Sequence, residues 1–136
     1  MVKVILWVSG GLLLVIAGVF GLQIIASETG EVVVLHSSDA QGQVHETRLW
    51  VVDHDGSAYL RVSAGGSGWY SRLQGNPRAS VERQGVSGAY LIVPRPELSD
   101  VVNTLMREKY GWRDAYISAT VAEREGSLPL QLQPVN

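Results

Sequence analysis

The sequence of 136 residues contains no cysteine. This absence excludes disulfide frameworks, thiolate zinc sites, iron–sulfur clusters and cysteine nucleophiles. Charged residues are also scarce, at 18% of the chain against about 25% in a typical soluble domain, whereas hydrophobic residues make up 46%. The length is that of a single domain. Part of the chain must therefore be unusually apolar.

An excess of positive charge is likewise missing. The chain has 11 basic and 13 acidic side chains, so its net charge is −2, and binding to nucleic acid through phosphate neutralisation is not expected. It has three histidines, which we interpret as ordinary exposed side chains rather than metal ligands. Neither a nucleophile elbow nor a Gly-x-x-x-x-Gly-Lys phosphate loop occurs.

The apolar excess lies at the N-terminus. No charged residue occurs from Val4 to Ala26, and a helix of that length spans the roughly 30 Å of a bilayer's hydrocarbon core. A cleaved signal peptide has a shorter apolar region and a small residue where this chain has Ile24. We therefore predict a transmembrane anchor over residues 1–27 and a second domain over residues 28–136, with membrane lipid as the partner of the anchor.

The residues that flank the apolar run indicate its orientation. Lys3 precedes the apolar run, whereas Glu28 and Glu31 follow it. Between the end of the run and Arg48 there is no Lys or Arg. Positive residues stay on the cytoplasmic side of a membrane. The flanks therefore predict a single-pass protein of the inner (cell) membrane, with its C-terminal domain in the periplasm or otherwise outside the cytoplasm.

The rest of the chain has the pattern of a β-rich domain. Apolar runs and turn signals, among them Asp55-Gly56, predict strands joined by hairpins. The seven expected strands cover residues 32–35, 46–52, 57–64, 79–84, 88–93, 116–123 and 128–132. A short helix is expected over 69–75, and spacings of three and four from Leu98 to Tyr110 predict an amphipathic helix. The fold class is mainly β, a small antiparallel barrel with two or so peripheral helices, preceded by one transmembrane helix.

Polar side chains occur in phase on two of the expected strands. Side chains alternate between the faces of a strand, so the aliphatic Leu60 and Val62 should face the core. Arg61 and Ser63 should then face outward, beside Arg48 of the preceding strand. Guanidinium and hydroxyl groups on one patch can bind a phosphate or a carboxylate. A solvated sheet face whose arginines pair with acidic neighbours is the alternative.

The run from Glu46 to Glu82, ETRLWVVDHDGSAYLRVSAGGSGWYSRLQGNPRASVE, resembles the central segment of the split-barrel flavin-binding superfamily. That superfamily includes pyridoxamine-phosphate-oxidase-like proteins and deazaflavin-dependent nitroreductases. The shared parts are a strand, an acidic-Gly hairpin, a second strand, a glycine-rich loop and a short helix before Asn-Pro. They lie here at residues 47–52, 53–56, 59–63, 65–68 and 69–77. The Trp69-Tyr70 pair and the stretch Lys109-Tyr110-Gly111-Trp112 are also similar to sequences in this superfamily.

The resemblance implies a split β-barrel that binds FMN or a deazaflavin and passes a hydride to a nitroaromatic or quinone-like acceptor. It implies a cofactor site made of Thr47, Arg48, Arg61, Ser63, Trp69, Tyr70 and Arg72. Tyr70 or Tyr110 could donate a proton, but no catalytic residue is assigned. The resemblance also implies pairing into a homodimer that builds the cofactor site at its interface.

A non-catalytic function is the alternative to the oxidoreductase that the resemblance implies. Deazaflavin relatives carry a basic turn before the second strand, whereas residues 37–42 of this chain contain Asp39 and no cation. A charge-assisted hydrogen bond to a phosphate contributes about 1.5–3 kcal/mol, so its loss matters for cofactor binding. The alternative is a membrane-tethered barrel that has lost the cofactor and binds a ligand or a protein.

Overall fold

A computed structural model describes residues 2–28, 30–63, 67–120 and 127–135. Its helical elements are α1 (Val2–Glu28), α2 (Gly68–Gly75), the short 3-10 helix η1 (Pro96–Leu98), α3 (Ser99–Tyr110) and α4 (Trp112–Thr120). Its strands are β1 (Val32–Ser38), β2 (Val44–Trp50), β3 (Val52–His54), β4 (Ser57–Val62), β5 (Arg78–Arg83), β6 (Val86–Pro94) and β7 (Leu128–Pro134).

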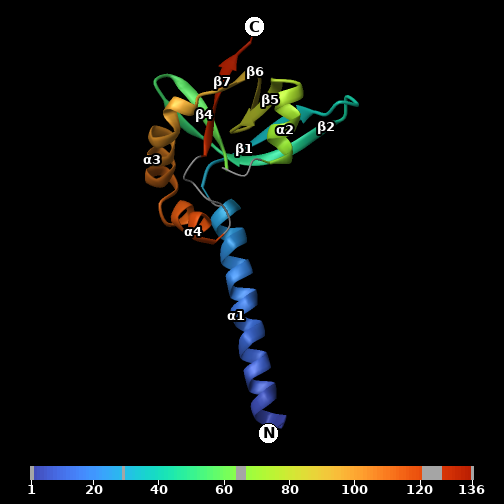
Figure 1. The fold of residues 1–136 in the computed structure, drawn as a ribbon, viewed down its shortest axis with the longest axis vertical. Coiled ribbons are helices and arrows are strands. Elements are labelled where there is room, and N and C mark those ends of the chain that lie inside the picture. Colours follow the sequence, from blue (N-terminus) through green and yellow to red (C-terminus); the bar gives the residue numbers. More distant parts are fainter. Residues whose placement is uncertain (1, 29, 64–66, 121–126, 136) are drawn as a thin grey trace.

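The strands form one antiparallel sheet in the order β2-β1-β5-β6-β7-β4-β3. The sheet curls into a half-barrel, and β2 and β4 come close to each other although they are separated in this order. Helix α1 extends away from the barrel, with α3 and α4 on one side of it (Figure 1). The predicted fold class, a split barrel with peripheral helices and an N-terminal apolar helix, is confirmed.

Two tight turns fix the register of the hairpins. Asp55 and Gly56 both have positive φ, 51° and 79°, and so do Gln84 and Gly85, at 52° and 79°. Two consecutive residues of positive φ are typical of the type I′ turn, whose twist matches that of the flanking strands. The Asp-Gly turn predicted from the sequence is confirmed, as is the connection across Gly85.

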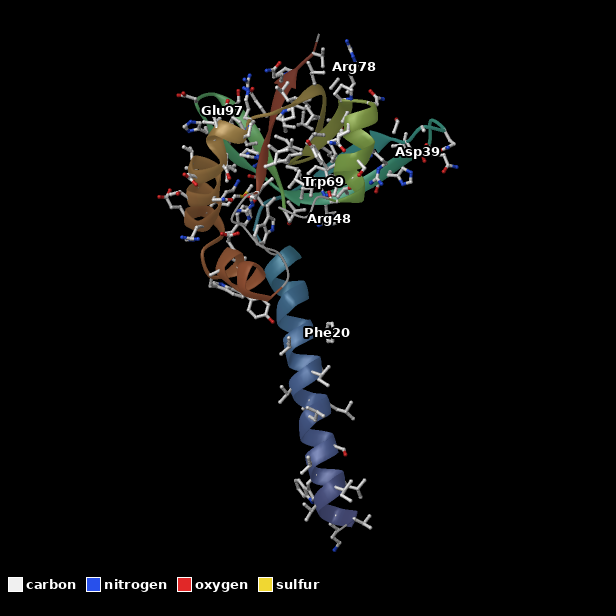
Figure 2. The ribbon with its side chains drawn as sticks, in the orientation of Figure 1. Phe20, Asp39, Arg48, Trp69, Arg78 and Glu97 are labelled. Carbon is white, nitrogen blue, oxygen red and sulfur yellow. The ribbon has the colours of Figure 1, made fainter. Side chains whose placement is uncertain are left out.

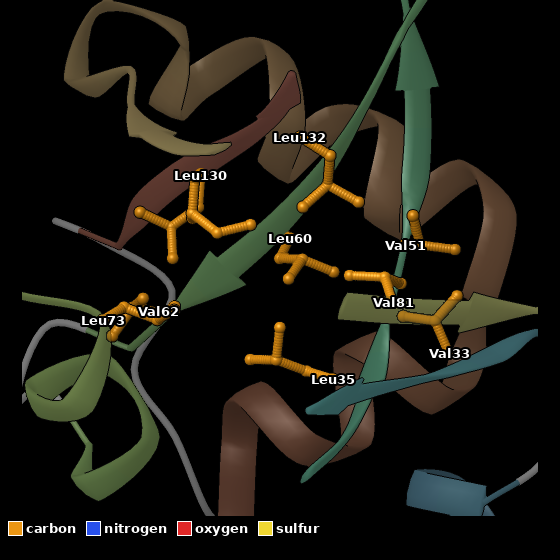
Figure 3. Close-up of a cluster of buried hydrophobic side chains, with 10 residues drawn as sticks. Val33, Leu35, Val51, Leu60, Val62, Leu73, Val81, Leu130 and Leu132 are labelled. Carbon is orange, nitrogen blue, oxygen red and sulfur yellow. The ribbon is translucent and has the colours of Figure 1, made fainter. Parts of the chain in front are cut away.

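The inner face of the curled sheet holds the main hydrophobic core. Leu60 and Val62 of β4 point into it, as their alternation predicts, and Leu73 closes it from α2. Figure 3 shows these side chains converging from opposite strands. The buried residues of this core are Val33, Leu35, Val51, Leu60, Val62, Leu73, Val81, Ile92, Leu130 and Leu132.

A second, smaller core lies between α3 and the outer face of β3 and β4. Val102, Met106 and Tyr110 of α3 are buried there at a spacing of four, against Val52 and Tyr59 of the two strands. This burial confirms the amphipathic helix predicted after Pro96. The Tyr110 ring also stacks on Trp50, with ring centroids 4.3 Å apart and planes 9° apart.

The strand expected over 46–52 is divided at Val51 into β2 and β3. The Tyr110 hydroxyl accepts a hydrogen bond from the Val51 backbone N–H at 3.0 Å. Lys109 donates from Nζ to the Val51 carbonyl oxygen at 2.7 Å. Helix α3 therefore satisfies the backbone groups that the ladder leaves unpaired at this break, as buried polar groups require.

The prediction of a strand over 116–123 is wrong for residues 116–120, because residues 112–120 form helix α4. Residues 121–123 lie outside the described residues. Aromatic and β-branched residues at Tyr116 and Ile117 favour a strand locally. Tertiary contacts override that preference here, since α4 packs between α1 and α3.

Helix α1 contains the apolar run read from the sequence. Its window from Val2 to Phe20 has a mean hydropathy of 2.2, and none of that window is buried in the protein. By length and composition it can cross a membrane, and an N-terminal signal sequence would satisfy the same criteria.

We predict that Tyr110→Phe lowers the free energy of unfolding of the detergent-solubilised protein by roughly 1–3 kcal/mol, because the buried Val51 N–H loses its acceptor. Denaturant unfolding followed by circular dichroism measures this loss. Tyr90→Phe is the matched control, since the Tyr90 hydroxyl makes no hydrogen bond within the described residues. Equal stability of the two variants would contradict the role given to Tyr110.

Candidate functional site

The structure separates the residues predicted to bind the cofactor. Arg61 lies on the outer face of β4 beneath α3 and α4, where it binds Asn103 and Asp114. Arg72 extends from α2 to Ser37 on the inner face of β1. Ser63 follows the end of β4 and is half-buried. The two guanidinium groups therefore lie on different faces of the sheet and do not meet in one anion site.

Arg61 is buried rather than exposed to solvent. Its side chain is 3% exposed, and Nη2 lies 2.6 Å from Oδ1 of Asp114, which is itself 1% exposed. Burial lowers the pKa of Arg61, and the adjacent Asp114 carboxylate opposes that shift. Strand alternation predicted the face of Arg61, but the prediction that this face is open was wrong, because α3 and α4 cover it.

The Arg61 site extends into a network of buried polar groups. Arg61 Nη1 donates to Oδ1 of Asn103 at 3.1 Å, and Ser127 Oγ donates to the same oxygen at 2.9 Å. The Ser127 carbonyl oxygen in turn accepts from Ser99 Oγ at 2.8 Å. Asn103, Asp114 and Ser127 were not identified from the sequence, because the segment around Asp114 was read as the approach to a strand.

Helix α2 closes one end of the barrel and carries three of the predicted site residues. Ser67 caps it, accepting a hydrogen bond from the Tyr70 N–H at 3.3 Å. Trp69 and Tyr70 are partly buried against the main core. Arg72 donates from Nε to Oγ of the buried Ser37 at 3.2 Å. The short helix read from the sequence is thus confirmed, and it brings an arginine to the end of β1.

A hollow of about 310 Å³ lies between α2 and the β1–β2 turn. Its lining offers a guanidinium, hydroxyl groups and an amide, from Arg72, Ser38, Ser71 and Asn76. These are donors of the kind that hold a single phosphate group. Sequence reasoning missed Ser38, Ser71 and Asn76, although Asn76 stands in the Asn-Pro motif that marks the end of α2.

Asp39 also lines this hollow, but its carboxylate is engaged within its own turn. Oδ1 accepts from the N–H groups of Gln41 and Gln43, both at 2.9 Å. Oδ2 lies 2.8 Å from Nε2 of His45. The hydrogen bond with His45 is the main cause that lowers the pKa of Asp39. The negative charge is thus stabilised locally rather than directed at the arginine.

Thr47 and Arg48 point to opposite faces of β2. Thr47 lies opposite the buried Leu35 and so faces inward, whereas Arg48 lies opposite Val34 and is exposed on the outer face. Figure 2 shows Arg48 and Trp69 on the side of the barrel nearest to α1, and Arg78 on the far side. Arg48 and Trp69 are therefore on the α1 side of the barrel, whereas the hollow lies toward the C-terminal end of α2.

Four charged side chains, which sequence reasoning missed, meet where the chain leaves α1. Arg83 binds Glu31 through Nε at 2.9 Å and Asp53 through Nη2 at 2.8 Å. Lys109 Nζ lies 2.6 Å from Oε1 of Glu31. These cations, Arg83 first, lower the pKa of Glu31 to about 2. This cluster of Glu31, Asp53, Arg83 and Lys109 joins the residue just before β1 to β3, β5 and α3.

No family model and no curated relative matches the chain, but solved structures share its fold. One, described as an F420-H2-dependent reductase, matches with a TM-score of 0.56 and 17% identity, over 75% of this chain and 93% of that one. A putative pyridoxamine 5′-phosphate oxidase from Listeria innocua matches with 0.58 and 12%, over 83% and 90%. A structure described as a domain-swapped dimer matches with 0.59 and 17%, over 75% and 79%.

These similarities define the class of the fold. The chain shares the split-barrel fold of these solved structures, so the resemblance read from residues 46–82 is confirmed at the level of the fold. The identities lie below 20%, and the comparison therefore carries architecture rather than activity.

We predict that Arg61→Ala lowers the free energy of unfolding by about 3–5 kcal/mol, because it leaves the buried Asp114 carboxylate unpaired. Replacing both partners, in Arg61→Met with Asp114→Leu, should restore most of that stability. Arg78→Ala, at an exposed position, should change it by no more than about 0.5 kcal/mol. Denaturant unfolding of the four proteins decides the matter, and a mild effect of Arg61→Ala would mean that the pair is solvated.

Proposed function

We propose that the protein is a membrane-anchored oxidoreductase of the split-barrel class, which binds FMN or a deazaflavin and reduces a quinone-like or nitroaromatic acceptor. Residues 1–27 would be the transmembrane anchor and residues 28–136 the working domain. The observation that carries the proposal is the donor-lined hollow between α2 and the β1–β2 turn, in a fold shared with an F420-H2-dependent reductase.

The residues around the hollow fit the phosphate end of such a cofactor. Arg72 would hold the phosphate together with the hydroxyl group of Ser38 and the side-chain amide of Asn76. Thr47 lies on the inner face of β2 and could extend the site, whereas Arg48 lies on the outer face and is left out of it. Trp69 and Tyr70 would border the ring system and exclude water from it. Arg61 is left out of this set, because Asp114 and Asn103 already occupy its guanidinium.

A reduced flavin or deazaflavin supplies the hydride when it is bound. The chain's own part would be binding, orientation and the movement of a proton. Of the two tyrosines considered, Tyr110 is unsuited to give up a proton. Burial raises its pKa to about 12, and its hydroxyl is hydrogen-bonded to Val51 and Glu31. Tyr70, on α2, is the candidate that remains.

The placement of the candidate residues supports a lipid-soluble acceptor. Arg48 and Trp69 lie on the side of the barrel nearest to α1 (Figure 2). If α1 crosses the membrane, this side faces the bilayer, where quinones dissolve. A second copy of the chain would complete the cofactor site at a homodimer interface, in keeping with the neighbour described as a domain-swapped dimer.

The second candidate function is a non-catalytic, membrane-tethered barrel that binds a ligand or a protein. The observation that favours it is the ion pair between Arg61 and Asp114, which withdraws one of the three arginines expected to contact the cofactor. Asp39 in the hollow favours it as well, since a carboxylate beside a phosphate costs binding energy unless it is compensated.

The binding prediction is tested by titrating the purified full chain in detergent with FMN and with deazaflavin, followed by cofactor fluorescence. We expect saturable binding of one of them. Arg72→Ala should weaken it roughly ten- to a hundred-fold, the equivalent of about 1.5–3 kcal/mol for a charge-assisted contact. Arg107→Ala, at an exposed position of α3, is the matched control and should bind as the wild type does.

Two results would count against the oxidoreductase. Absence of binding of either cofactor at several hundred micromolar would favour the non-catalytic barrel. Binding that Arg72→Ala leaves unchanged would mean that the cofactor sits elsewhere than in the hollow at α2.

The membrane topology is predicted separately. With Lys3 inside and the barrel outside the cytoplasm, alkaline phosphatase fused after Asn136 should be active. A green fluorescent protein fused at the same point should be dark. The reverse pair of results would place the barrel in the cytoplasm, where nicotinamide and deazaflavin reductants are present.

A further inference from the structure

Helix α4 has one face turned to the barrel and another turned away from it. Asp114 is buried against Arg61. Trp112 is 51% exposed, and Ala115 is exposed as well. Residues three and four apart share a side of a helix, whereas residues two apart lie nearly opposite each other. Trp112, Ala115 and Tyr116 therefore form a face that points away from the ion pair.

This face lies against α1. The Tyr116 hydroxyl donates a hydrogen bond to the Val19 carbonyl oxygen at 2.9 Å, and α4 packs beside the barrel end of α1 (Figure 1). The contact fixes the height of α4 along the apolar helix. The depth of Val19 in a bilayer is therefore also the depth of α4.

The depth of Val19 follows from the length of α1. Sixteen rises of about 1.5 Å separate Lys3 from Val19, or about 24 Å, against a hydrocarbon core of about 30 Å. With Lys3 at one edge of the core, Val19 lies about 6 Å inside the other edge. If Glu28 instead stands just outside that other edge, Val19 lies about 12 Å inside it. In both registers the part of α4 at Tyr116 lies about 6–12 Å below the boundary between acyl chains and headgroups, within one leaflet.

The side chains on this face suit that boundary. Trp and Tyr are enriched at membrane interfaces, where an apolar ring and a polar group can both be satisfied. The Arg113 guanidinium lies over the Trp112 ring at 5.3 Å, and a long basic side chain can reach the phosphates while its stem stays in apolar surroundings. The exposure of a large aromatic ring on this helix otherwise has no explanation in the fold.

We propose that α4 is immersed in the membrane interface, with Trp112 and Tyr116 among the upper parts of the acyl chains and Arg113 reaching toward the phosphates, as a second contact with the bilayer beside α1. This inference rests on the proposed span of α1. The partner is the lipid surface itself. Because Asp114 fixes α4 to Arg61, contact of α4 with lipid would hold the barrel in one orientation, with Arg48 and Trp69 toward the membrane.

The absence of native cysteine allows a depth measurement at single sites. The variants Leu13→Cys, Ala115→Cys and Arg78→Cys of the full chain are each labelled with a nitrobenzoxadiazole dye and reconstituted into phosphatidylcholine vesicles. Lipids brominated at shallow or deep acyl positions serve as quenchers. Leu13 is on the proposed span, Ala115 is on α4, and Arg78 is exposed on the side of the barrel away from α1 (Figure 2).

We expect deep bromines to quench the label at 13, shallow bromines to quench the label at 115, and neither to quench the label at 78. Adding Trp112→Ala and Tyr116→Ala to the Ala115→Cys variant should abolish most of the shallow quenching. A quenched label at 13 with a label at 115 as unquenched as that at 78 would overturn this inference and leave the span intact. An unquenched label at 13 would overturn the span, and this inference with it.

Discussion

The ion pair between Arg61 and Asp114 is the contact on which the arrangement of the domain depends. Both side chains are almost fully buried, so each charge requires the other, and the removal of either leaves an uncompensated charge in a place that water does not reach. The pair joins β4 to α4, and Asn103 and Ser127 extend it to α3 and β7. A single buried guanidinium thus determines how two helices lie on the outside of the barrel.

A second joint acts where the chain leaves α1. Glu31 is held by Arg83 and Lys109, and its backbone carbonyl oxygen accepts a hydrogen bond from the Tyr110 hydroxyl at 2.6 Å. This cluster fixes the start of β1 on the barrel, whereas the hydrogen bond from Tyr116 to the Val19 carbonyl oxygen ties α4 to α1.

Sequence periodicity predicts the local geometry of this chain well. It predicts poorly which helices pack over a given face of the sheet. Preferences for φ and the alternation of strand side chains predict the Asp55-Gly56 turn and the inward direction of Leu60 and Val62. Spacings of three and four predict the buried face of α3. Alternation also places Arg61 on the outer face, but it cannot say whether a helix covers that face. The segment from Trp112 has a strand-like composition, and it became a helix because Asp114 and Tyr116 make contacts distant in sequence.

The candidate site was misjudged for the same reason. Arg61 and Arg72 both belong to the segment that resembles flavin-binding proteins, and motif order gives them similar weight. Only burial distinguishes them: Arg61 has a carboxylate within 2.6 Å, whereas Arg72 meets a serine hydroxyl at 3.2 Å and borders a hollow. A guanidinium bound to a neutral hydroxyl keeps most of its capacity for an anion, while one bound to a buried carboxylate does not. The position of α4 therefore separates the two arginines: it commits Arg61 to the fold, whereas Arg72 is the one that we propose for a ligand.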